Sequence, residues 1–401
     1  MMLSFSQNPQ NIDNKICHTT PLLYLLSCLL LACAFFLFPI GTKYFCIPLF
    51  IVILISIAQQ LKLKINLLAD HNIKAELIPW IPVALSITVL TCIHGTSGYS
   101  IYFIGLALLI LGRLALGNFR INEKFAVISL TVSLVICCLA IIIYIANYGL
   151  GSHIFDINRN ILLCGLTLIF SAILGALLTS YHSYSKTEIA LIFLCSLLYL
   201  VVLSMTQVRT AVLGLVALVP IVIIFSKKAP KIILIQLVPL FLLILSFFMS
   251  DRLQQGLHDL ELWNKGNPNS SWGIRLELWK FAVTGFLEHP LFGWGAKPFH
   301  EMIDSGLTWP IPSFDASHFH NDIFNNLVSN GLLGVTGWFI TIFLLFKYFW
   351  KNSALVCLLV TSLAMGLSER IWFDNKACLP ILISLWLIFS VSKIHPKQHT
   401  K

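Results

Sequence analysis

The sequence predicts an all-α protein that crosses a membrane about twelve times and carries one large loop outside it. Three observations lead to this fold class. The composition is 58% hydrophobic and only 11% charged, whereas soluble domains carry about 25% charged residues. The apolar residues fall in runs close to the roughly 20 residues that a helix needs to cross a bilayer. One polar and aromatic segment, residues 251–328, interrupts those runs.

Twelve apolar stretches are candidate spans, of which the second and the eleventh are short. They cover residues 21–40, 45–58, 77–95, 99–116, 125–147, 161–180, 188–205, 210–226, 231–250, 329–346, 354–368 and 376–392. The first stretch lacks a clear small-residue cleavage site and is followed directly by another span. We therefore expect it to be a retained anchor and not a removed signal.

Basic residues predict the orientation of these spans, because Lys and Arg gather on the inner side of a membrane. With the N-terminus inside, sixteen Lys and Arg residues lie on the inner side and five lie in short outer loops. Those five are Lys43, Arg159, Arg209, Arg370 and Lys376. Both termini are therefore expected inside and the long loop outside. The net charge of +9 follows mostly from this asymmetry and does not indicate a nucleic-acid partner.

The loop divides the chain into a membrane part with about nine spans (1–250), a loop domain (251–328) and a membrane part with about three spans (329–401). A loop of this length is usually functional or disordered. Five tryptophans and seven phenylalanines in it favour a folded domain. Apolar residues at helical spacing predict a helix over 272–288, and a second helix is expected to start near Asn321.

All eleven cysteines lie in or beside predicted spans, and none lies in the long loop. The sequence therefore predicts neither a disulfide framework nor a cysteine metal site there. Small apolar packing is the expected role of these side chains.

Three arginines are candidate ligands of an anionic substrate. Arg209 follows Gln207 between two apolar spans with almost no loop around it, and a charge at that depth normally faces a cavity or a partner. Arg275 precedes Trp279 by one helical turn, so its planar guanidinium can bind a phosphate at two points beside an aromatic ring. Arg159 is the third outer cation. Each has a structural alternative, either as a snorkelling interface side chain or as the salt-bridge partner of a nearby carboxylate.

The densest polar cluster is the run Ser317-His318-Phe319-His320-Asn321-Asp322. Histidine is the side chain most easily tuned to accept a proton near neutral pH, so either imidazole can serve as a base. Two histidines separated by one residue can instead bind a metal. No carboxylate or cysteine lies at a convincing spacing to complete the ligand set, so we expect no metal. A structural His-Asn cap of the following helix is the remaining alternative.

Several common catalytic motifs do not occur in the long loop: an Asp-x-Asp pair, a glycine-rich phosphate loop and a Gly-x-Ser-x-Gly elbow. Their absence argues against a metal-dependent nucleotide-sugar transferase and against a serine hydrolase. The residues themselves indicate a membrane protein whose outward-facing arginines and histidines suit an anionic, lipid-linked substrate.

Three segments resemble the O-antigen ligase family, whose wider group includes O-antigen polymerases and protein O-oligosaccharyltransferases. The similarity lies in Leu203-Ser204-Met205-Thr206-Gln207-Val208-Arg209-Thr210, in Gly273-Ile274-Arg275-Leu276 and in the run from His318 to Gly334. In that family a His followed by ten residues and a Gly ends the large loop. Here this spacing selects His320 with Gly331.

The resemblance implies a metal-independent, inverting glycosyltransferase without a cofactor, with a fold like that of the membrane-embedded GT-C transferases. Its donor would be O-antigen linked to undecaprenyl diphosphate, and its acceptor would be an outer-core sugar of lipid A-core. It would lie in the bacterial inner membrane, among membrane lipids, with both termini cytoplasmic and the active site periplasmic. His320 would be the catalytic base, and Arg209 and Arg275 would bind the diphosphate and stabilise its charge. The remaining expected substrate contacts are Arg159, Gln207, Trp279, His318, Asn321 and Asp322, of which the last two would orient the imidazole.

Two other functions stay open. An O-antigen polymerase usually has two substantial periplasmic loops, whereas the outer loop at 148–160 is short here, so the ligase is preferred. A lipid-linked glycan flippase would need cationic residues along a path through the membrane. The predicted spans are nearly free of internal charge, which argues against a flippase.

Overall fold

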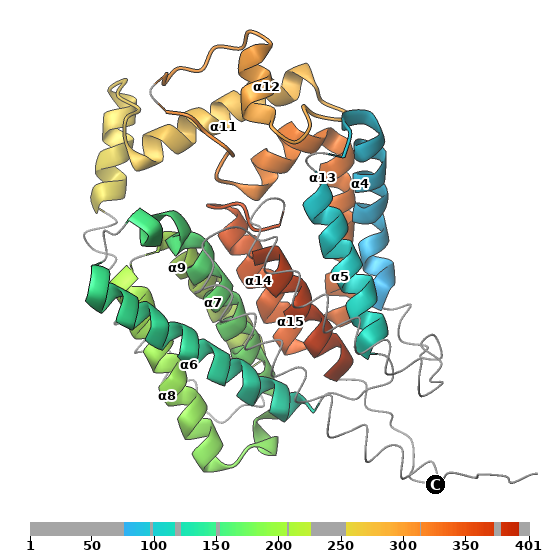
Figure 1. Cartoon of the computed structure of the whole chain (residues 1–401), viewed down its shortest axis with the longest axis vertical. Helices are drawn as coiled ribbons and strands as arrows, with labels where there is room; N and C mark the ends of the chain where they lie inside the picture. Colours follow the sequence, from blue (N-terminus) through green and yellow to red (C-terminus); the bar gives the residue numbers. More distant parts are fainter. Residues whose placement is uncertain are drawn as a thin grey trace, which may run out of the picture.

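The computed structural model describes residues 76–96, 99–116, 122–149, 153–206, 208–225, 254–312, 314–372 and 378–392. Within these residues all regular structure is helical (Figure 1). The helices are α4 (Ile81–His94), α5 (Ser100–Leu116), α6 (Glu123–Tyr148), α7 (His153–Ser180), α8 (Lys186–Thr206), α9 (Arg209–Phe225), α11 (Ser271–Glu288), α12 (Pro298–Asp304), α13 (Asp322–Phe349), α14 (Ser353–Gly366) and α15 (Cys378–Ser392), with short 3-10 turns at Ile78–Trp80 and Tyr181–Ser183. Residues 254–264 form one further helix.

Helices α4 to α9 and α13 to α15 coincide with nine of the twelve predicted spans. The other three predicted spans, 21–40, 45–58 and 231–250, lie outside the described residues. Four described helices are both long and apolar enough to cross a membrane: Glu123–Tyr148, Asn160–Ser183, Lys186–Thr206 and Asp322–Phe349. The remaining helices of the bundle are apolar but shorter. The predicted all-helical, membrane-type architecture is confirmed, and the count of twelve spans stays a prediction.

Helix α7 lies at the centre of the bundle, where it packs against α6, α9, α14 and α15. The most apolar stretch of this helix is 94% buried inside the protein. A Cβ on Gly175 would lie 2.6 Å from the carbonyl oxygen of Ser353, and the Ser353 hydroxyl donates a hydrogen bond to the Gly175 carbonyl. Small residues allow such close helix contacts in a membrane. Because α9 also packs against α14, the first residues of α9 lie beside the end of α14.

Residues 254–312 and 314–321, which we call the outer segment after the side of the membrane predicted for them, cover one end of the bundle (Figure 1). Helix α11 of this segment confirms the helix predicted over 272–288, and Ser270 caps it by accepting a hydrogen bond from the Gly273 amide at 3.1 Å. Aromatic and apolar side chains form a separate core beneath it, made of Leu278, Phe281, Ala282, Phe299, Met302, Trp309, Ile311, Ala316, Phe319 and Val328. The loop aromatics thus pack together, as their number in the sequence predicted.

Helix α13 confirms the second predicted helix and bends at Gly331, whose φ of 60° lies in the left-handed region. The bend frees four backbone groups, which pair with residues 290–295. The hydrogen bonds are Trp294 N to Val328 O (2.8 Å), Gly295 N to Ser329 O (2.9 Å), Leu332 N to Pro290 O (2.8 Å) and Leu333 N to Leu291 O (3.2 Å). We call this set of contacts the kink junction. A Cβ on Gly331 would lie 2.4 Å from the Leu291 carbonyl carbon, so the junction requires glycine there.

Candidate functional site

Two imidazoles and one carboxylate meet where the outer segment joins α13. His318 Nε2 lies 2.8 Å from Glu369 Oε1, and His320 Nδ1 lies 3.4 Å from the same oxygen. The two imidazole centroids are 4.0 Å apart. Glu369 lies in the turn that follows α14, so the fold brings together residues about fifty positions apart in the sequence. We call His318, His320 and Glu369 the His-Glu cluster.

The backbone between the two histidines is fixed by Phe319. Its side chain is fully buried in the core of the outer segment, and its carbonyl accepts a hydrogen bond from the indole Nε1 of Trp279 at 3.0 Å. Trp279, an expected substrate contact, therefore also supports the main chain of the cluster. His320 has a φ of 48° and is the sole non-glycine residue with positive φ in the described part of the chain. Such strain costs roughly 1–3 kcal/mol and tends to occur at functional sites.

Asn321 and Asp322 attach the start of α13 to the turn that carries Glu369. The Asn321 side chain caps α13 by accepting from the amides of Ile323 and Phe324, and its Nδ2 donates to the Leu367 carbonyl at 2.9 Å. The buried Asp322 carboxylate accepts from the backbone amides of residues 371 and 372 at 2.9 and 3.1 Å. The helix cap is thus made by Asn321, while the imidazoles contact Glu369. Our expectation that Asn321 and Asp322 orient the imidazole overlooked this carboxylate.

One glycine contact and one hydroxyl contact set how closely the turn that carries Glu369 approaches its neighbours. A Cβ on Gly366 would lie 2.4 Å from Asp322 Oδ2, so glycine at this position permits the approach of the carboxylate. The Ser368 hydroxyl donates to Thr210 Oγ1 at 3.0 Å. Because Thr210 follows Arg209 and Ser368 precedes Glu369, this bond joins the start of α9 to the cluster.

The charge of Glu369 is held by its two histidine neighbours. Burial alone would raise the pKa of this carboxyl, but the hydrogen bond from His318 and the nearby imidazole of His320 outweigh burial and hold the pKa well below its usual range. Burial lowers the pKa of His318, against the opposing effect of Glu369. The cluster therefore contains a carboxylate and an uncharged His318 at neutral pH.

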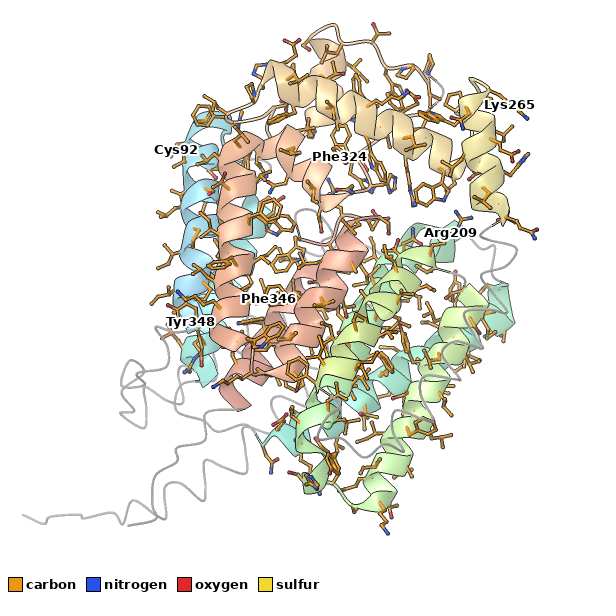
Figure 2. The ribbon with its side chains drawn as sticks, turned by 180° about the vertical axis from the view of Figure 1, so that it is seen from behind. Cys92, Arg209, Lys265, Phe324, Phe346 and Tyr348 are labelled. Atoms are coloured by element: carbon orange, nitrogen blue, oxygen red, sulfur yellow. The ribbon has the colours of Figure 1, made fainter. Side chains whose placement is uncertain are left out.

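Arg275 and Arg370 lie close enough to Glu369 for its charge to affect their pKa values, and Arg209 affects the pKa of Arg275. Burial lowers the pKa of Arg275, Glu369 is near enough to raise it, and Arg209 is near enough to lower it further. Burial likewise lowers the pKa of Arg370 to about 10, while Glu369 opposes that shift. Figure 2 shows Arg209 at the end of α9 that faces the outer segment. Arg209 and Arg275, which lie far apart in the sequence, therefore act on the same small region.

An alternative pairing of Arg275 with Glu277 was also open from the sequence. In the structure Glu277 accepts from the indole of Trp263 at 2.7 Å and from Lys280 at 3.1 Å. The charges that affect the pKa of Arg275 are instead those of Glu369 and Arg209.

The His-Glu cluster offers three donor atoms that lie within 4.8 Å of one another, close enough to share a metal ion. Sequence spacing gave no third ligand because Glu369 is remote from the histidines along the chain. Arg275 and Arg370 are near this carboxylate, and Arg209 is near Arg275. Positive charges close to the cluster oppose the binding of a cation. The same charges favour an anion beside the cluster.

Two of the expected substrate contacts lie outside the part of the chain that the structure describes. The side chain of Arg159 and all of Gln207 are not among the described residues. The main residue that sequence reasoning missed is Glu369. Its signal was present: a carboxylate next to Arg370, directly after an apolar stretch, is a charged residue at membrane depth and a functional candidate by default.

Comparison with known proteins gives two results. A family model described as O-Antigen ligase matches residues 191–339, a range that contains Arg209, Arg275 and both histidines of the cluster. The chain is also 26% identical over 230 residues to the O-antigen ligase of Escherichia coli (strain K12), a match that covers 52% of this chain and 54% of that relative. The match thus spans about half the length of the relative. The chain is thus similar to O-antigen ligases over a range that includes most of the candidate site.

Proposed function

We propose that this protein is an O-antigen ligase that transfers O-antigen glycan from undecaprenyl diphosphate to an outer-core sugar of lipid A-core. The observation that carries the proposal is the proximity of Glu369 to His318, His320 and Arg275, with Arg209 near enough to Arg275 to affect its pKa. Cations for a diphosphate and a base for a hydroxyl are thus present at one site. We propose that the reaction takes place at the periplasmic face of the inner membrane.

In the proposed reaction, His320 removes the proton of the acceptor hydroxyl as its oxygen attacks the anomeric carbon. The bond from that carbon to the diphosphate oxygen breaks, and undecaprenyl diphosphate leaves with the bonding electron pair. Attack from the face opposite the leaving group inverts the anomeric configuration. Arg209 and Arg275 bind the diphosphate and stabilise the charge that grows as it departs, the type of stabilisation that is often the largest catalytic term.

The first test replaces His320 by Ala in a strain that lacks its own ligase, followed by electrophoresis of the lipopolysaccharide. We expect core without long glycan at normal expression, because removal of a base typically costs about 10²–10⁴-fold in rate. His300→Ala is the matched control, since His300 is a half-exposed histidine of the same segment. Full capping of core by the His320 variant would exclude this residue as the base.

The same gel separates the ligase from a polymerase. Deletion of a ligase leaves core without any O-unit, whereas deletion of a polymerase leaves one O-unit attached to core. The second pattern would contradict the proposed reaction.

A purified reaction tests metal independence. Protein, lipid-linked O-antigen and lipid A-core are incubated with and without a chelator, in the absence of nucleotide. We expect equal product in both, because the guanidinium groups supply the positive charge that a metal supplies elsewhere. Loss of product with the chelator and its recovery with a divalent ion would assign the His-Glu cluster to a metal.

A further inference from the structure

We propose that Glu369 is a positioning residue that fixes the tautomer of His320 and leaves its Nε2 as the basic nitrogen. This inference rests on the proposed function, because it concerns the base of that reaction. It starts from the hydrogen-bond chemistry of the cluster. A carboxylate accepts hydrogen bonds and donates none, so each imidazole nitrogen that faces Glu369 must carry a proton.

Both ring nitrogens of His318 have a hydrogen-bond partner. Nε2 donates to Glu369 at 2.8 Å, which leaves Nδ1 as an acceptor for the Ser317 hydroxyl at 2.9 Å. One orientation of protons therefore satisfies Ser317, His318 and Glu369 together. His318 is in this way committed to Glu369 and has no basic nitrogen free for a substrate.

For His320, the nitrogen nearest to Glu369 is Nδ1, which is buried, lies 3.4 Å from Oε1 and has no hydrogen bond to another group among the described residues. A proton on this nitrogen would point to the carboxylate, whereas a lone pair there would be repelled by it. A neutral imidazole with its proton on Nδ1 has its lone pair on Nε2. The side chain of His320 is 25% exposed, against 8% for Glu369, so a substrate can reach the imidazole more readily than the carboxylate. This is the arrangement in which a carboxylate orients a catalytic histidine and stabilises the imidazolium that forms.

The position of Glu369 is itself fixed from two sides. Asn321 donates to the carbonyl of Leu367, two residues before it, and the Asp322 carboxylate accepts from the amides of residues 371 and 372. Ser368 ties the same turn to α9. The carboxylate thus sits on a rigid support, which a positioning group needs if it is to hold an imidazole within a fraction of an ångström.

The test compares Glu369→Gln, Glu369→Asp and Glu301→Gln in the purified transfer reaction. Glu301 is an exposed carboxylate of α12 and serves as the matched control. We expect Glu369→Gln to lower kcat by about 10²–10⁴-fold, because an amide nitrogen facing Nδ1 favours the wrong tautomer. The KM for the lipid-linked donor should change by less than about threefold, since the group lost acts mainly in the chemical step.

Glu369→Asp retains the carboxylate and should recover at least about tenfold of the kcat lost in the Gln variant. Thermal unfolding in detergent is measured for all three proteins. A Glu369→Gln protein that folds normally and keeps wild-type kcat would overturn the inference. So would a loss that appears only in KM or is matched by the Asp variant, because a purely structural or binding role would then suffice.

The outcome for His320→Ala separates this inference from the proposed function. If that variant is inactive while Glu369→Gln is fully active, the base stands and the positioning role fails. If His320→Ala is active, the proposed reaction itself fails.

Discussion

At Arg209 and Arg275, the contribution of positive charge can be tested separately from the contribution of the planar guanidinium shape. Lysine keeps the positive charge of arginine but loses the planar fork that binds a diphosphate at two points. We expect Arg209→Lys and Arg275→Lys each to lower kcat/KM by about 10–100-fold, equivalent to roughly 1.4–2.7 kcal/mol. Transfer rates with purified donor and acceptor give this value. Lys280→Ala, which removes a more exposed cation of α11, is the control, and wild-type rates in both Lys variants would contradict two-point binding.

Gly331 is a second residue with a sharp prediction. Alanine there meets two penalties, a left-handed backbone and a Cβ placed 2.4 Å from the Leu291 carbonyl carbon. Gly266 also has a positive φ, of 81°, but a Cβ at that position meets nothing within 4 Å. Gly266→Ala should therefore cost about 1–2 kcal/mol, and Gly331→Ala distinctly more. Thermal unfolding in detergent measures both, and equal losses would show that the close contact at Gly331 is unimportant.

At the scale of elements, the start of α13 joins helix capping to the support of the site. Asn321→Ala removes the cap and the donor to Leu367, and should cost about 0.5–2 kcal/mol of stability together with activity. Asn321→Asp keeps an oxygen that can cap the helix but loses the Nδ2 donor. We expect near-normal stability and reduced transfer in the Asp variant, measured by thermal unfolding and by the purified reaction. Equal stability of the Ala and Asp variants would contradict the capping role.

At the scale of the whole molecule, the orientation predicted from basic residues is testable by fusion. Alkaline phosphatase folds to an active enzyme outside the cytoplasm. Fused after Ser185, in the predicted inner loop between α7 and α8, it should be inactive. Fused after Ser305, in the outer segment, it should be active. Activity of both fusions, or the reverse pattern, would reject the arrangement with both termini inside.

Local sequence patterns predicted the helices because their signals are short-range. The apolar period over 272–288 and the capping residue Asn321 each lie within a few positions of the structure they specify. The membrane-type helices follow from runs of apolar residues in the same way. Such signals do not depend on how distant segments meet.

The candidate site was only partly predictable, because it is formed by contacts between segments that lie far apart in the sequence. His318, His320, Arg209 and Arg275 stood out as unusual residues in their own surroundings. The contact of Glu369 with the two histidines depends on α14 packing against α9 and on the turn bonded to Asp322, which no local spacing encodes. The bend at Gly331 likewise has its cause in residues 290–295.

The kink junction has a consequence for the way a bulky glycan gains access. Lifting that corner of the outer segment would break four backbone hydrogen bonds, each of which contributes about 0.5–1.5 kcal/mol to stability. We therefore expect this corner to stay bonded to α13 when other parts of the outer segment move. We expect an opening that admits a long sugar chain to pivot at this junction, with the largest displacement at residues 254–264 and the N-terminal end of α11. In hydrogen exchange, the amides of Trp294, Gly295, Leu332 and Leu333 should accordingly outlast those of 254–264.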